Sequence, residues 1–64
     1  MQLLLNGSTL PIAQLGPDFL ILRNPIDHAP ADATIVMTVD ASERRWTVTL
    51  PDGISNGSER VRIA

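Results

Sequence analysis

The sequence predicts an all-β fold, a small antiparallel meander of five or six short strands closed as a small barrel or folded sandwich. Three observations predict this class. Short runs of apolar and β-branched residues recur along the chain, dipeptides that contain Gly or Pro separate them, and no long stretch has the period of an amphipathic helix. With 64 residues, the chain is expected to form a single small β-domain over residues 1–64.

The first two strands are predicted as a hairpin closed by Asn6-Gly7. Asn-Gly supplies both positive-φ positions of a type I′ turn, the strongest short-range hairpin signal. Closure on this turn places Leu3 opposite Leu10. Because Pro11 has no N–H to donate to a neighbouring strand, we expect the second strand to lie at an edge of the sheet or to end at this residue.

The third strand is predicted at residues 18–23, between Gly16-Pro17 and Asn24-Pro25. Its sequence, Asp-Phe-Leu-Ile-Leu-Arg, is apolar on both faces, which suits a central strand that is covered on both sides. The proline-containing segment that follows, up to Asp32, is predicted as a loop.

Residues 33–50 are predicted as a second hairpin, around which the rest of the chain is organised. Alternate residues of a strand share a face, and directly opposed residues of two paired strands share one too. The inner face is expected to carry Ala33, Ile35, Met37 and Val39 on the first strand, and Trp46, Val48 and Leu50 on the second.

The register of this hairpin is predicted from the same alternation. Pairing Val39 with Trp46 keeps the apolar residues on one face and places Asp40 opposite Arg45 on the other, a favourable cross-strand pair. A four-residue loop over residues 41–44 is preferred to a two-residue Ser42-Glu43 turn, because Ser and Glu resist the positive φ that such a turn needs.

The last strand is predicted at residues 58–63, with Val61 and Ile63 inside. Two turn signals precede it, Pro51-Asp52-Gly53 and Asn56-Gly57. The predicted core contains Leu3, Leu10, Phe19, Ile21, Ile35, Met37, Val39, Trp46, Val48, Leu50, Val61 and Ile63, with Leu20 and Leu22 as further candidates.

Composition argues against several classes of function. The net charge is −2, with five Lys and Arg residues against seven Asp and Glu residues, which gives no broad attraction to nucleic acid or to an anionic membrane. No apolar run approaches the roughly 20 residues of a transmembrane helix, and the N-terminus lacks the features of a signal peptide. We therefore expect a soluble, cytoplasmic protein.

Catalytic and cofactor chemistry is not expected. The chain has no Cys and no Tyr, its serines fall in predicted turns, and it has no glycine-rich phosphate-binding motif. The one cluster with a titrating imidazole is Asp27-His28 with Asp32 nearby, which could ligate a divalent metal. A solvated loop is the favoured interpretation of this cluster, so the metal-dependent site is a remote alternative and no cofactor is predicted.

The favoured hypothesis is a non-catalytic β-domain that contacts protein, either a partner or another copy of itself. A chain this small buries limited apolar surface, and self-association or docking would support it. The alternative is a small barrel that binds single-stranded nucleic acid or another anion through a patch of Arg residues. The predicted interaction surface comprises Thr38, Arg45, Thr47, Thr49, Arg60 and Arg62, whereas Trp46 is expected to anchor the core.

Overall fold

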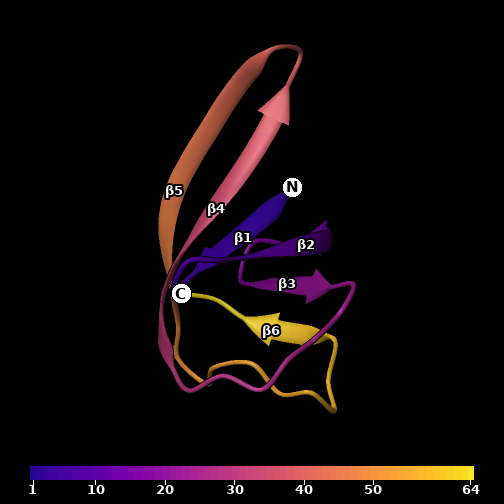
Figure 1. The fold of residues 1–64 in the computed structure, drawn as a ribbon, viewed down its shortest axis with the longest axis vertical. Helices are drawn as coiled ribbons and strands as arrows, with labels where there is room; N and C mark the ends of the chain where they lie inside the picture. Colours follow the sequence, from indigo (N-terminus) through magenta and orange to yellow (C-terminus); the bar gives the residue numbers. More distant parts are fainter.

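The computed structural model describes all 64 residues and arranges them as one curled antiparallel sheet, a half-barrel without helices (Figure 1). The predicted all-β class is therefore confirmed. The order of the strands across the sheet is β5-β4-β1-β2-β3-β6. The strands are β1 (Gln2–Leu5), β2 (Ser8–Leu15), β3 (Phe19–Leu22), β4 (Ala31–Val39), β5 (Ser42–Leu50) and β6 (Arg60–Arg62).

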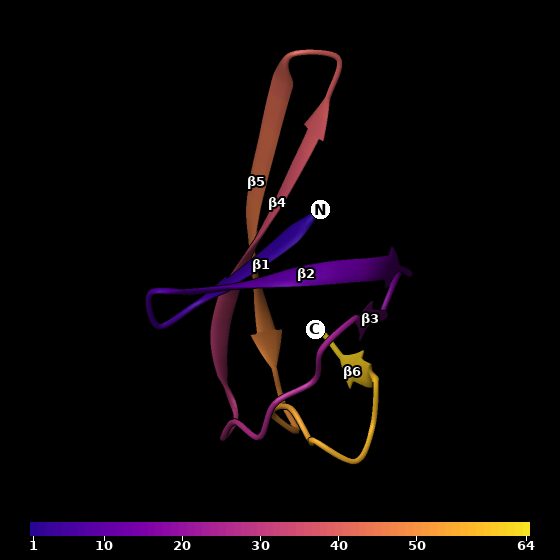
Figure 2. The ribbon, with the colours of Figure 1, turned by 45° about the vertical axis from the view of Figure 1, so that its right-hand side comes forward.

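The two end strands of the sheet meet at one place only. Ala64, just after β6, exchanges two backbone hydrogen bonds with Thr49 of β5, with N···O distances of 3.0 and 2.9 Å. The C-terminus accordingly lies beside the lower part of β5 in both ribbon views (Figures 1 and 2). The sheet thus closes at its base, and we call this contact the seam.

The β4–β5 hairpin extends well beyond the other strands (Figures 1 and 2). β1 pairs with β4 only from Thr34 to Val36, so the rest of β4 towards the tip has β5 as its one neighbour. We call the projecting part, residues 37–46, the arm.

The first hairpin follows the prediction. Leu3 opposes Leu10, and the turn residues have φ of 49° at Asn6 and 80° at Gly7. The expectation for Pro11 was wrong, since β2 continues to Leu15 and lies between β1 and β3. Pro11 is tolerated there because its backbone faces β3 at the point where β3 has ended: its carbonyl accepts a bond from Arg23, the residue after that strand.

The register predicted for the second hairpin was wrong, although the faces were assigned correctly. Ile35, not Val39, opposes Trp46, and Arg45 lies opposite Val36 instead of Asp40. The turn consists of Asp40 and Ala41, with φ of 48° and 66°. This shift relative to the predicted pairs is an even number of residues, so each side chain stays on its predicted face.

The predicted core needs correction at several positions. On β3, Leu20 and Leu22 are buried while Phe19 and Ile21 are half-buried, because a run that is apolar on both faces does not reveal which face is inside. On the hairpin, Val39 and Trp46 are exposed and Met37 is half-buried. The observed core consists of Leu3, Leu5, Ile12, Leu20, Leu22, Ala33, Ile35, Val48, Leu50, Ile54, Val61 and Ile63, with Leu10 packed partly buried against it.

The turns between β5 and β6 form where they were predicted. The N–H of Gly53 donates to the carbonyl of Leu50 over 3.1 Å, and that of Ser58 donates to Ser55 over 3.0 Å. Ile54, between these turns, exchanges two backbone hydrogen bonds of 2.9 Å with His28. This bridge ties the β3–β4 loop to the β5–β6 loop and completes the base.

Candidate interaction site

The inner face of the arm presents an apolar strip, which we define as the exposed Val39 and Trp46 and the half-buried Met37. All three share the face that Ile35 and Val48 bury at the base. Val39 is 50% exposed and Trp46 is 38% exposed, whereas Ile35 is fully buried. The strip is therefore a continuation of the core face that the rest of the chain covers only in part.

A shallow hollow lies on this face near the tip. Its volume is about 380 Å³, and its lining combines two apolar side chains with a hydroxyl and two opposite charges. The lining residues are Met37, Val39, Asp40, Ser42 and Arg44. Asp40 and Arg44 form no ion pair within the chain, so both charges are available to a partner.

On the outer face of the arm, charges pair within one strand. The Arg45 guanidinium donates to both carboxylate oxygens of Glu43, with N···O distances of 3.0 and 3.3 Å. This hydrogen bonding, with the attraction of the opposite charges, lowers the pKa of the Glu43 carboxyl and raises the pKa of the Arg45 guanidinium. Both side chains are at least half exposed, so the contact contributes little to stability.

The predicted hairpin residues of the interaction surface share the outer face. Thr38, Arg45, Thr47 and Thr49 are all exposed. The hydroxyl of Thr49 donates to Asp32, which lies opposite it on β4, over 3.0 Å.

The two arginines of β6 lie across the seam from this face and already have partners. The Arg60 guanidinium lies 4.3 Å from the centre of the Phe19 ring, and Arg62 approaches Asp52 at 3.6 Å. Arg45 is held by Glu43 on the arm. The structure thus divides the predicted Arg patch between two regions, and nucleic-acid binding through it stays a prediction from the sequence.

The free edge of β5 is the second exposed feature of the arm. Beside a two-residue hairpin turn the closing residues form a hydrogen-bonded pair, and every second pair then points its backbone groups away from the partner strand. Counting from Val39–Ser42, the outward-pointing residues of β5 are Glu43, Arg45, Thr47 and Thr49. The backbone groups of Thr49 pair with Ala64, which leaves the other three residues unpaired along this edge.

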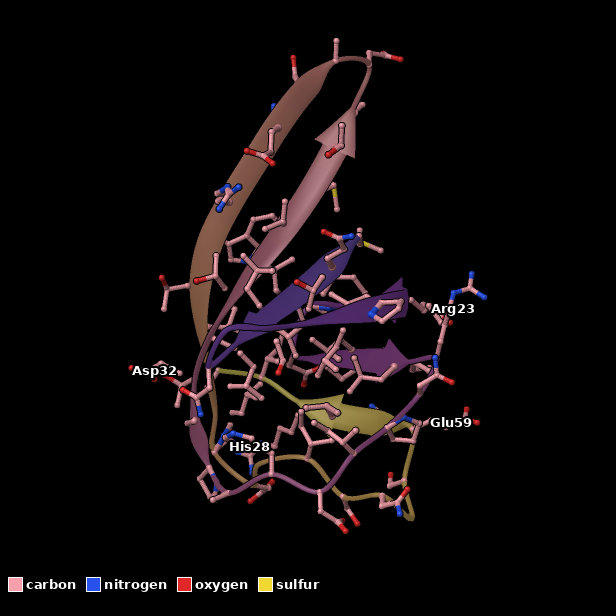
Figure 3. All side chains as sticks on the ribbon, in the orientation of Figure 1. Arg23, His28, Asp32 and Glu59 are labelled. Atoms are coloured by element: carbon pink, nitrogen blue, oxygen red, sulfur yellow. The ribbon has the colours of Figure 1, made fainter.

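The Asp27-His28 cluster does not form a metal-ligand set. The Nδ1 of His28 lies 2.7 Å from the carbonyl of Ala29, and its Nε2 lies 3.0 Å from the Asn6 side-chain nitrogen. Asp27 accepts a hydrogen bond of 2.7 Å from the backbone of Asn56. No group of three or more His, Cys, Asp or Glu residues lies close enough to hold an ion. His28 and Asp32 lie on the side of the base opposite Arg23 and Glu59 (Figure 3).

Sequence reasoning identified the two faces of the hairpin but placed the apolar strip in the core. What alternation does not indicate is how far the neighbouring strands extend along the hairpin. Four-residue β1 is shorter than nine-residue β4, so a mismatch in strand length indicates which part of a long hairpin is left uncovered.

Comparison of the chain with protein-family models, with curated proteins and with solved structures finds no match. The structure contains no helix that could span a bilayer.

Proposed function

We propose that this chain is a non-catalytic domain that works by contact with protein, and that the contact surface is the arm. The observation that supports the proposal is the apolar strip of Met37, Val39 and Trp46 on a hairpin that projects from the closed base. Tryptophan is among the residues that most often dominate binding energy at protein interfaces. A cytoplasmic location stays part of this proposal.

The polar groups around the strip fit a protein surface. An interface commonly has an apolar centre and a polar rim with available hydrogen-bonding groups and charges. Here the hollow near the tip brings Asp40, Ser42 and Arg44 beside the apolar residues. The unpaired backbone groups of β5 add a row of donors and acceptors at the side of the strip.

Site-specific photo-crosslinking tests the proposal. A photoreactive residue replaces Ser42, which lines the hollow, or Thr9, an exposed residue of β2 that serves as the control position. In cells that express the tagged chain, we expect discrete protein adducts from position 42 and none from position 9.

The adducts must also depend on the strip. Combining the position-42 probe with Val39→Thr and Trp46→Thr should remove them, because the polar replacements take away the two exposed apolar side chains of the strip without changing the outer face. Equal adducts at both positions, or adducts that survive the double replacement, would overturn the proposal. The mass of each adduct shows whether the partner is another protein or a second copy.

A further inference from the structure

We infer that the partner of the arm is a second copy of this chain, joined through antiparallel pairing of the two β5 edges around a two-fold axis at Arg44. This inference rests on the proposed function and names its partner. In this arrangement Glu43 of one copy lies opposite Arg45 of the other, twice, once on each side of the axis.

The first argument is the length and regularity of the β5 edge. Natural sheets shield their edge strands by making them short, or by placing Pro, bulges or charged side chains in them, Lys above all. The charges of β5 are Glu43 and Arg45, which pair with each other on the outer face, and Arg44 on the inner face. β5 is nine residues long, contains neither Pro nor Lys, and pairs with β4 without a bulge. The other end strand, β6, has only three residues. The long edge is therefore open to another strand at Glu43, Arg45 and Thr47.

The second argument is that this edge is complementary to itself. Its outer-face charges read Glu43 then Arg45, so an antiparallel copy presents Arg45 to Glu43 and Glu43 to Arg45. Opposite charges directly across two strands stabilise the pairing, whereas like charges destabilise it. Each of the two pairs also exchanges both backbone hydrogen bonds, because these residues point their N–H and C=O groups outward.

The seam and the outer-face charges together exclude the competing registers. An axis at Trp46 would bring Glu43 against Thr49, where Ala64 already lies. An axis at Arg45 would place the two Arg45 side chains opposite each other and would push the turn residue Ala41 against the same occupied position. An axis at Glu43 would oppose two carboxylates. The axis at Arg44 avoids these conflicts on the outer face and at the seam.

In the dimer the two sheets join into one, and their inner faces lie on the same side. Trp46 of each copy lies diagonal to Arg44 of the other, within reach of a long cationic side chain. The two Arg44 side chains face each other at the axis, which is the unfavourable contact of this register. Arg44→Thr would remove this repulsion together with the contact to Trp46, so the charges at positions 43 and 45 are the ones that test the pairing.

Sedimentation velocity over a series of concentrations, with the purified full chain, tests the inference. We expect a reversible monomer–dimer equilibrium for the unaltered chain. Glu43→Arg and Arg45→Glu should each weaken the dimer about tenfold or more, because each turns both cross-strand pairs from attractive to repulsive. An equimolar mixture of these two variants should dimerise again, since every Glu then faces an Arg.

Proline substitution provides a matched pair on the same edge. Arg45→Pro and Thr47→Pro each remove an outward N–H that β4 does not use, so neither breaks a backbone hydrogen bond between β4 and β5. Only the first removes a hydrogen bond of the proposed dimer, and only it should abolish dimerisation. If it fails to fold, the mixing experiment still decides.

Several outcomes would overturn the inference. These are a folded chain that stays monomeric at all concentrations, charge-reversal variants that dimerise as well as the unaltered chain, and a mixture that fails to restore the dimer. A monomeric chain whose position-42 probe still yields adducts with another protein would refute the second copy and leave the proposed function intact. Loss of both results would refute both proposals.

Discussion

The base and the arm of the β4–β5 hairpin belong to the same two strands and have the same alternation of side chains, yet they differ in burial. At the base, Ala33 and Leu50 are buried under the opposite wall of the half-barrel. On the arm, Val39 and Trp46 occupy the same face and are exposed. Alternation decides which face a side chain takes, whereas burial requires that another element lies over that face.

The difference has a physical cause in strand length and closure. The seam between Thr49 and Ala64 and the bridge between His28 and Ile54 hold the base together from both sides. Beyond Val36, β4 has no neighbour except β5. An isolated two-stranded hairpin is marginally stable in water, so the arm depends on the base and gains most from an additional strand.

The largest expected effect lies at the base. A Cβ at Gly53 would collide with the backbone of His28, in the bridge that joins the two loops, and the φ of +65° is strained for any L-residue with a side chain. Gly53→Ala should therefore lower the free energy of unfolding by about 3 kcal/mol or more. Chemical denaturation measures this change.

Gly7→Ala is the matched control for this prediction. Its φ is +80°, but no atom lies within 4 Å of the added Cβ. The strain of the left-handed conformation alone should cost about 1–2 kcal/mol. Equal losses for the two substitutions would show that the contact with His28 does not contribute, and that the base is looser than its hydrogen bonds indicate.

A valine on each half of the hairpin tests the comparison directly. Val48→Ala, at a position that is 7% exposed, should cost about 2–3 kcal/mol because it leaves a cavity in the core. Val39→Ala, at a position that is 50% exposed, should cost less than about 1 kcal/mol. The measurement is urea unfolding at protein concentrations where both variants are monomeric. A cost at Val39 equal to that at Val48 would mean that the arm is covered in the monomer.

Much of this hairpin was predictable, and the error in register has a definite origin. The faces followed from the alternation of apolar residues, which the structure confirms at Ile35, Val48 and Leu50. The turn did not follow, because Ala41 adopts a positive φ that alanine disfavours. Turn propensity favoured Asn6-Gly7 correctly and gave no strong signal at Asp40-Ala41. The position of this turn is determined by the pairing of the two strands and not by the local turn propensity of its residues.

The candidate site was harder to predict than the fold. The exposed outer-face residues were located from alternation, but the strip on the inner face depends on where β1 ends relative to β4. That length difference is a property of two distant segments and their register. The free edge of β5 likewise depends on the seam at Ala64, which no local pattern in the sequence indicates.

The strained turn at the tip of the arm gives a prediction of opposite sign. Ala41 has φ of +66°, so Ala41→Gly should raise the free energy of unfolding by about 0.5–1 kcal/mol by relieving this strain. The control is Ala33→Gly in the buried part of β4, which should destabilise the protein by about 1 kcal/mol. Thermal and urea unfolding of the two variants would refute the assignment of this turn if Ala41→Gly were also destabilising.

The smallest expected effect concerns the charges of the arm. Arg45 lowers the pKa of Glu43, so the folded state favours the ionised carboxylate. The resulting stabilisation is present above the pKa that Glu43 has in the unfolded chain, and it is lost as the pH falls through the lower pKa of the folded state.

An NMR titration of the Glu43 carboxyl should give a pKa below the usual value, and Arg45→Gln should return it towards that value. Because both groups are exposed, the shift should also shrink as salt is added. A Glu43 pKa that does not respond to Arg45→Gln would show that the two side chains do not remain paired in solution. The proposed contacts between Glu43 of one copy and Arg45 of the other would then lose the support of this pairing. The unpaired backbone groups of β5 would still be available to another strand.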